Sequence, residues 1–200
     1  MTAPYPVHLD IESTNLCNLS CIMCPHRQMQ RKKGIMAWDT FQAIIDQSRG
    51  RSKTSYLHQI GEPLMNSRII DMINYTADAG IRTSISTNGM LLSSCMAKKL
   101  CSCQLDELTL ALDGVTEETY SKFRVGGDFT QVMSNIINFI QTRQAMREGP
   151  SIQIQMIHMD GNHDEAERLR DMFEGMLLRD DEVLIKEYST FAGFVPDHGG

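Results

Sequence analysis

The chain has 200 residues, of which 42% are hydrophobic and 22% charged, and its formal net charge is -6. This length allows one domain with a sizeable core, and the acidic balance argues against a general nucleic-acid binder. No apolar run approaches the roughly 20 residues of a membrane span, and residues 1–7 lack the features of a secretory signal. We therefore expect no nucleic-acid or membrane partner. Six Cys without a signal indicate a reducing, cytoplasmic compartment.

Strand and helix patterns alternate along the chain. Strands are predicted over 7–12, 55–60, 82–86, 107–112, 152–157 and 183–188. Helices, with apolar residues three and four apart, are predicted over 38–47, 69–77, 93–103, 129–140 and 166–177, with Gly80 as the stop of the second. This alternation predicts an α/β fold of parallel βαβ units with the helices outside. It is compatible with an open, partial (β/α) barrel and with an open doubly wound sheet, and no helix is predicted after the sixth strand.

The first predicted strand is followed by three cysteines within eight residues, Cys17, Cys21 and Cys24. A [4Fe–4S] cluster held by protein alone needs four Cys thiolates. Three ligands from one loop would leave one iron open to bind another molecule. An open coordination position is what separates a reactive metal site from a structural one.

Polar, turn-forming motifs follow the next three predicted strands. They are Gly61-Glu62-Pro63, Ser86-Thr87-Asn88-Gly89 and Asp113-Gly114. Each motif alone is compatible with an ordinary turn. In parallel α/β folds the chemistry gathers at the carboxyl ends of the strands, so these motifs and the cysteine loop should share one face of the sheet.

Together these motifs resemble the radical S-adenosylmethionine (radical SAM) superfamily over nearly the whole chain. The Cys-x3-Cys-x2-Cys spacing, the Gly-Glu-Pro, the Ser-Thr-Asn-Gly and the Leu-Asp-Gly all fit that family. Residues 120–127 and the tail Thr190-Phe191-Ala192-Gly193 resemble enzymes with a C-terminal SPASM-type extension. The resemblance implies a partial (β/α)6 barrel forming one core domain over residues 1–200. We expect this domain to lack the last helix and any auxiliary-cluster domain, since no further Cys follows.

The resemblance also implies the cofactors, a [4Fe–4S] cluster and SAM, with Cys17, Cys21 and Cys24 as metal ligands. The turn at Gly61, Glu62 and Pro63 would accept from the SAM amino group, and Ser86 and Asn88 would meet the ribose. A guanidinium suits the SAM carboxylate, and Arg124 is the candidate. Asp113 would orient substrate or ribose. The adenine would lie against the backbone at Met23 and against apolar residues near strands five and six, Met156 or Ile157. No catalytic residue is expected beyond these ligands.

The expected activity is reductive cleavage of SAM that starts hydrogen-atom abstraction from a peptide, protein or small-metabolite substrate. Reduced flavodoxin or ferredoxin would donate the electron. The alternative is a non-catalytic scaffold that binds an Fe–S cluster, or zinc with His26 as the fourth ligand. His58 and Gln59 are further candidates for the cavity, and the basic stretch 27–33 is compatible with a solvated loop, an anionic substrate or an acidic electron donor.

Overall fold

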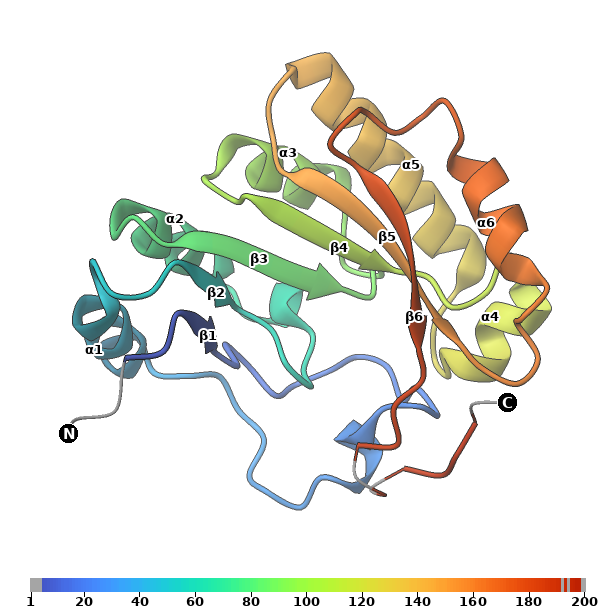
Figure 1. Ribbon diagram of the computed structural model, residues 1–200, viewed down its shortest axis with the longest axis horizontal. Helices are drawn as coiled ribbons and strands as arrows, with labels where there is room; N and C mark the ends of the chain where they lie inside the picture. Colours follow the sequence, from blue (N-terminus) through green and yellow to red (C-terminus); the bar gives the residue numbers. More distant parts are fainter. Residues whose placement is uncertain (1–4, 192, 194, 199–200) are drawn as a thin grey trace.

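The computed structural model describes residues 5–191, 193 and 195–198, and it contains a six-stranded sheet with the order β1-β2-β3-β4-β5-β6 (Figure 1). The strands are β1 (His8–Asp10), β2 (Thr54–Tyr56), β3 (Arg82–Thr87), β4 (Glu107–Ala111), β5 (Ser151–His158) and β6 (Glu182–Glu187). All five neighbouring pairs are parallel. The six predicted strands are confirmed, although β2 ends at Tyr56, before the predicted Ile60.

Helices connect the strands: the five predicted helices are present, and α4 (Glu117–Phe123) is an additional one that was not predicted. The helices are α1 (Trp38–Ser48), α2 (Ile69–Asp78), α3 (Ser94–Ser102), α4 (Glu117–Phe123), α5 (Phe129–Met146) and α6 (Glu165–Phe173), with short 3-10 turns η1 (Pro25–Gln28) and η2 (Pro63–Met65). Ser93, Thr116 and Asp128 cap α3, α4 and α5 by accepting a first-turn backbone N–H. Gly80 follows α2 with a φ of 76°, a left-handed conformation that favours glycine at a helix end.

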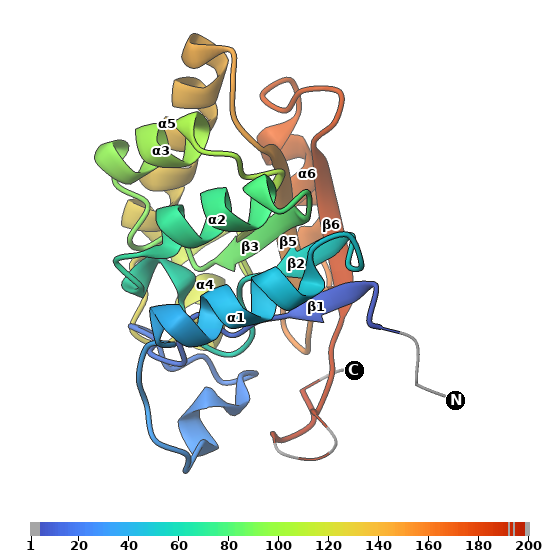
Figure 2. The ribbon, with the colours of Figure 1, turned by 90° about the vertical axis from the view of Figure 1, so that its left-hand side faces the viewer.

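The two faces of the sheet differ in polarity. The outward side chains, such as Leu108 and Ile154, are fully buried beneath the helices, whose layer is seen edge-on in Figure 2. The inward side chains are polar: Ser84 donates to Glu107 (3.0 Å). Two further inward pairs follow along the sheet, Thr109 with Gln153 (3.3 Å) and Gln153 with Glu182 (2.6 Å). The apolar core therefore lies between sheet and helices, and the concave face remains available for polar contacts.

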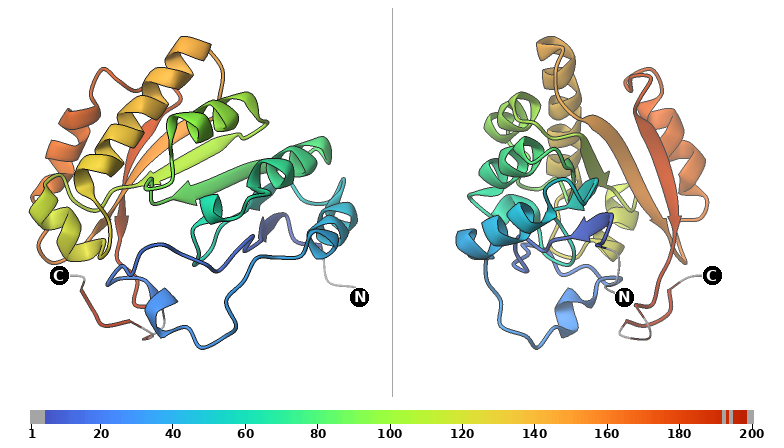
Figure 3. Two further views of the ribbon diagram at one scale, coloured as in Figure 1. Left: turned by 180° about the vertical axis from the view of Figure 1, so that it is seen from behind. Right: turned by 60° about the vertical axis from the view of Figure 1, so that its left-hand side comes forward.

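The sheet does not close on itself, because β1 and β6 are its two edges and are not paired with each other. Figure 3 shows these two strands at opposite ends of the curved sheet. The architecture is an α/β, partial (β/α)6 barrel, which confirms the predicted fold class. In the described part of the chain, no helix is long and apolar enough to pass through a lipid bilayer.

Candidate functional site

A pocket of about 160 Å³ lies at the carboxyl ends of the strands. Its lining comes from the loops after β1, β2 and β3, from β4 and β5, and from the end of α4. Most of the predicted site residues line it: Cys17, Cys21, Met23, Cys24, Gly61, Glu62, Ser86, Asn88 and Arg124. Three of the four strand-end motifs, which are far apart in the sequence, thus meet in one pocket, as the strand-end argument predicts.

The cysteine loop is fixed to the end of α4 by two backbone hydrogen bonds. The Ser20 N–H donates to the Val125 carbonyl (2.9 Å), and the Ile22 N–H donates to the Phe123 carbonyl (3.0 Å). Phe123 is 1% exposed and packs with the buried part of the loop. The arrangement brings Arg124 against the cysteines, and nothing in the sequence indicated this pairing.

The three cysteines are free thiols, of which Cys21 is buried and Cys17 and Cys24 are half-buried. Burial and, to a smaller extent, the charges of Glu62, Cys21 and Cys24 raise the pKa of Cys17 to about 11, against the lowering effect of a hydrogen bond from the Leu19 backbone. Burial also raises the pKa of Cys21, against the lowering effect of the Arg124 guanidinium. The thiolate, not the thiol, is the form that binds metal. Three thiolates close together repel one another, and bound iron would offset this repulsion by its positive charge. The donor set therefore fits a [4Fe–4S] cluster with three protein ligands.

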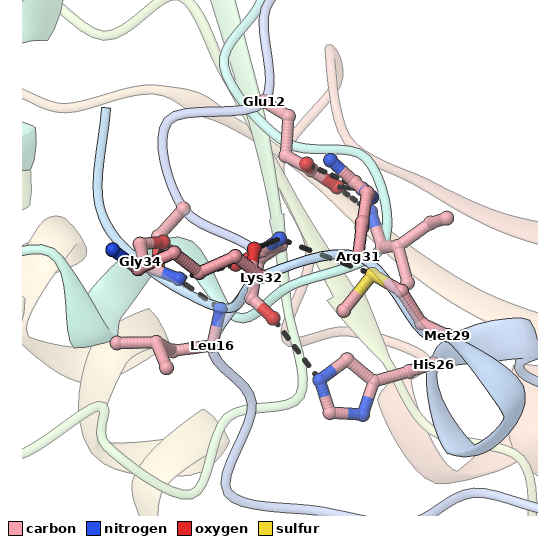
Figure 4. Close-up of polar contacts among 10 residues, drawn as sticks. Glu12, Leu16, His26, Met29, Arg31, Lys32 and Gly34 are labelled. Carbon is pink, nitrogen blue, oxygen red and sulfur yellow. Dashed lines mark hydrogen bonds and ion pairs between the residues drawn. The ribbon is translucent and has the colours of Figure 1, made fainter. Parts of the chain in front are cut away.

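His26 is hydrogen-bonded to the segment that precedes the cysteines. The ring is buried, and its Nε2 lies 3.0 Å from the Asn15 carbonyl oxygen, to which it donates (Figure 4). With the proton on Nε2, the Nδ1 atom carries the free lone pair, so this hydrogen bond by itself is compatible with the Cys3His zinc site considered as an alternative. Among residues 5–191, 193 and 195–198, no three His, Cys, Asp or Glu side chains surround a point where a single ion would sit.

The Gly61-Glu62-Pro63 turn packs tightly against the segment that precedes the cysteines. A Cβ on Gly61 would lie 2.1 Å from the Thr14 carbonyl oxygen, so only glycine fits. Glu62 is 2% exposed and accepts from the Leu64 N–H, the Thr87 hydroxyl and the Asn88 N–H. Burial raises the pKa of Glu62, and these hydrogen bonds oppose the rise. Glu62 thus joins the loops after β2 and β3 while it lines the pocket.

Ser86 and Asn88 both line the pocket, and both have partners there. The Ser86 N–H donates to Nδ1 of His58 (3.0 Å), so the neutral ring carries its proton on Nε2. The Asn88 amide donates to Asn18 Oδ1 (2.9 Å) and lies 3.9 Å from the Cys17 sulfur. Asn88 therefore supports the cysteine loop, a contact that the sequence did not predict. His58 and Gln59 line the pocket, as predicted.

Arg124 and Asp113 form a buried ion pair. The Arg124 Nε and Nη2 atoms lie 2.6 and 2.5 Å from Asp113 Oδ2, and Nη1 lies 3.9 Å from the Cys21 sulfur. Burial disfavours the charged guanidinium, but the charges of Asp113, Cys21 and Tyr120 and the hydrogen bond to Asp113 together outweigh this effect and raise the pKa of Arg124. Asp113 is 0% exposed, and its other oxygen accepts from the Ile157 N–H (2.7 Å). Asp113 lies behind the pocket lining, where it fixes Arg124, and its predicted role in orienting ribose or substrate stays a prediction.

Two other predicted contacts lie outside the pocket lining. Met156 is 0% exposed and belongs to the core beneath the helices, on the opposite face of β5 from Gln155 and Ile157, which do line the pocket. Pro63 is buried and begins η2. The alternation of Ile152 and Ile154 with Gln153 and Gln155 was the sequence signal for this orientation. It places Ile157, the other named candidate, toward the pocket.

The tail motif 190–193 is only partly described. Phe191 lines the pocket, whereas Ala192 lies outside the described residues.

Known proteins resemble this chain in sequence and in fold. Over 108 residues the chain is 34% identical to the tungsten-containing aldehyde ferredoxin oxidoreductase cofactor-modifying protein of Pyrococcus furiosus, which covers 53% of this chain and 30% of that protein. Streptococcus suis SuiB bound to S-adenosylmethionine matches in fold with a TM-score of 0.78 at 16% identity, over 98% of this chain and 44% of SuiB. The structure of anSMEcpe with bound AdoMet matches with a TM-score of 0.69 at 18% identity, over 92% of this chain and 52% of that one.

The chain thus spans between about a third and a half of the length of these proteins. The predicted resemblance to the barrels of SPASM-type radical SAM enzymes is confirmed at the level of the fold. The family model of the radical SAM superfamily matches residues 11–173, from the end of β1 through α6. With the cysteine loop, the Gly-Glu-Pro turn and the strand ends brought together in one pocket, this chain belongs to the radical SAM superfamily of enzymes.

Proposed function

We propose that this chain is the catalytic core of an enzyme that uses a [4Fe–4S] cluster and SAM to abstract a hydrogen atom from a peptide, protein or small-metabolite substrate. The observation that supports this most directly is the gathering of Cys17, Cys21 and Cys24 in one pocket with Glu62 and Arg124. When bound, the cluster and SAM supply the reductive cleavage of the sulfonium bond that produces a 5′-deoxyadenosyl radical.

The protein side chains would bind and orient these groups. Cys17, Cys21 and Cys24 would hold the cluster, while Arg124, fixed by Asp113, would meet the SAM carboxylate as a charged donor. Glu62 and the carbonyl groups of its turn would accept from the SAM amino group. Because Glu62 already accepts three hydrogen bonds, it is held in one orientation.

The nucleoside would lie along the loops that end β2, β3 and β5. Ser86 and Asn88 line the pocket where hydroxyl groups of a ribose would find polar partners. On this proposal the backbone at Met23 and the side chain of Ile157 would contact the adenine, both being part of the same lining. The backbone N–H of Ile157 is held by Asp113 (2.7 Å), which fixes that wall of the pocket.

Anaerobic reconstitution tests the proposal. The wild-type chain should bind close to four irons and four sulfides, and it should form 5′-deoxyadenosine from SAM when dithionite supplies electrons. Cys21→Ala should bind iron poorly and form no 5′-deoxyadenosine, because two thiolates hold such a cluster weakly. Cys95→Ala is the matched control, since Cys95 is an exposed free thiol on α3. Wild-type turnover by Cys21→Ala would contradict the assignment.

The alternative, a metal-binding scaffold without turnover, predicts a different result. A colourless protein with one zinc, or a brown protein that never cleaves SAM, would favour the scaffold. The proposal also includes a reducing, cytoplasmic location, which suits six free thiols. A reduced flavodoxin or ferredoxin would supply the electron, and residues 1–200 would act as a single core domain.

A further inference from the structure

A basic loop lies immediately after the cysteine motif. Residues 25–37, here called the basic loop, contain Arg27, Arg31, Lys32 and Lys33 and no Asp or Glu, although the whole chain has a net charge of -6. All four basic side chains are exposed. A charge run of this kind is often only a solvated surface, so its position and its rigidity decide whether it has a further role.

The backbone of the basic loop is fixed to the segment that leads into the cysteines. Asn15 donates from Nδ2 to the Lys32 carbonyl (3.0 Å) and accepts at Oδ1 from the Gly34 N–H (2.7 Å), as Figure 4 shows. The Thr14 hydroxyl donates to the Gly34 carbonyl (2.9 Å), and His26 donates to the Asn15 carbonyl (3.0 Å). Asn15 lies two residues before Cys17, so the loop is held in a fixed position relative to the cysteine motif.

Most of the positive charge on the basic loop is not neutralised within the chain. Arg31 pairs with Glu12 (2.6 Å), whereas Arg27, Lys32 and Lys33 form no ion pair within the described residues. Ile35, which is 49% exposed, adds an apolar side chain between the lysines and α1. The loop borders a surface hollow of about 570 Å³. Unpaired cations around an exposed apolar residue are suited to a protein surface of opposite charge.

We propose that the basic loop is the docking surface for an acidic one-electron donor protein of the flavodoxin or ferredoxin class. This inference rests on the proposed function, because it places the donor at the turn that leads out of the cysteine motif. Its carboxylates would meet Arg27, Lys32 and Lys33, which would steer association and set its orientation. A flavodoxin hydroquinone would lose one electron to the cluster and become the semiquinone, with no bond made or broken in the protein.

Two adjacent lysine pairs allow a matched test. Lys32→Glu/Lys33→Glu reverses the charge of the basic loop, and Lys98→Glu/Lys99→Glu makes the same change on α3, where both lysines are exposed. The reconstituted variants are titrated with an oxidised bacterial flavodoxin and with a plant-type ferredoxin, and the dissociation constant is measured at low and moderate salt. SAM cleavage is then driven either by the reduced donor protein or by dithionite.

The expected result is at least a tenfold weaker affinity for the preferred donor in Lys32→Glu/Lys33→Glu, with a smaller dependence on salt. Donor-driven SAM cleavage should fall by a similar factor, while dithionite-driven cleavage stays at the wild-type rate. Equal losses in the α3 variant, or unchanged affinity in the loop variant, would overturn the inference. A variant that binds an RNA oligonucleotide more weakly but binds both donor proteins as the wild type does would also overturn the inference. Absence of dithionite-driven cleavage in the wild type would instead contradict the proposed function.

Discussion

At the scale of single residues, the ion pair of Asp113 and Arg124 determines the polarity of the pocket wall. Asp113→Asn would leave the buried Arg124 charge without its partner, and breaking a buried pair in this way typically costs about 3–5 kcal/mol. We expect the free energy of unfolding in urea to fall by that order. Asp71→Asn is the control, because its pair with Arg68 is exposed and should contribute less than about 1 kcal/mol.

A double variant separates this charge effect from simple loss of packing. If the two side chains act as a pair, Asp113→Asn/Arg124→Gln should be less destabilised than the sum of the single variants. Additive losses would mean that the two side chains are not energetically coupled as a pair.

His58 should make stability depend on pH. Burial lowers the pKa of His58 from 6.5 to about 4, and Nδ1 is already used as an acceptor from Ser86. The unfolded chain therefore binds a proton at a higher pH than the folded chain does. The contribution of the neutral His58 ring to the free energy of unfolding is complete above about pH 6.5. It is lost as the pH falls toward 4, by up to about 1.4 kcal/mol for each pH unit.

Urea unfolding across this range, compared with His58→Gln, measures the contribution. The Gln carbonyl can accept from Ser86 without titrating, so the variant should lose less stability on acidification than the wild type. His163→Gln, a change at the surface, should follow the wild-type curve. Parallel curves for wild type and His58→Gln would show that the ring is not buried in its neutral form.

At the scale of elements, the loops after β1 and β2 depend on one close contact. Gly61→Ala would place a Cβ 2.1 Å from the Thr14 carbonyl oxygen, so one of the two loops must move. We expect this backbone clash to cost about 3 kcal/mol or more and to reduce iron binding on reconstitution. Gly34→Ala is a matched control, since its Cβ would meet nothing within 4 Å. Equal stability of the two variants would contradict the packing argument.

The regular elements could be predicted from the sequence, because each long helix and each strand has a periodic apolar pattern. The exception is α4 (Glu117–Phe123), which buries only Tyr120 and Phe123 and is too short to show a period. The sequence also predicts the end of β2 at Ile60, beyond the observed end at Tyr56. After Tyr56 the chain leaves the sheet, and His58 and Gln59 turn into the pocket lining, a change that apolar patterning does not record.

The site could be predicted only as a set of motifs. The rule that functional loops follow the carboxyl ends of parallel strands predicts which loops meet. Pairings between individual side chains depend on rotamers and on the path of each loop. The hydrogen bond from Asn88 to Asn18 and the ion pair of Arg124 with Asp113 are of this kind. The orientation of Met156, by contrast, could be predicted, because the alternation of apolar and polar residues along β5 places it on the apolar face.

At the scale of the whole molecule, the sheet combines an apolar outer face with a polar inner face. A closed barrel of this size is normally filled by its own side chains. Here the inner face holds Ser84, Glu107, Thr109 and Gln153, joined in hydrogen-bonded pairs. Such a lining can exchange its partners for those of a polar substrate, and the unpaired edges at β1 and β6 leave the sheet open along one side.

The open sheet should be visible in hydrogen exchange. The strands β3, β4 and β5 have neighbours on both sides, so their amides should exchange only on global unfolding. In β6, each residue can pair only with β5, and the side chains at Glu182, Lys186 and Glu187 are exposed. We expect the β6 amides that point away from β5 to exchange at least a hundredfold faster than those of β4, as measured by NMR on the intact chain. Uniform protection across β4 and β6 would mean that the edge is covered, and a substrate would then need another way to the polar face.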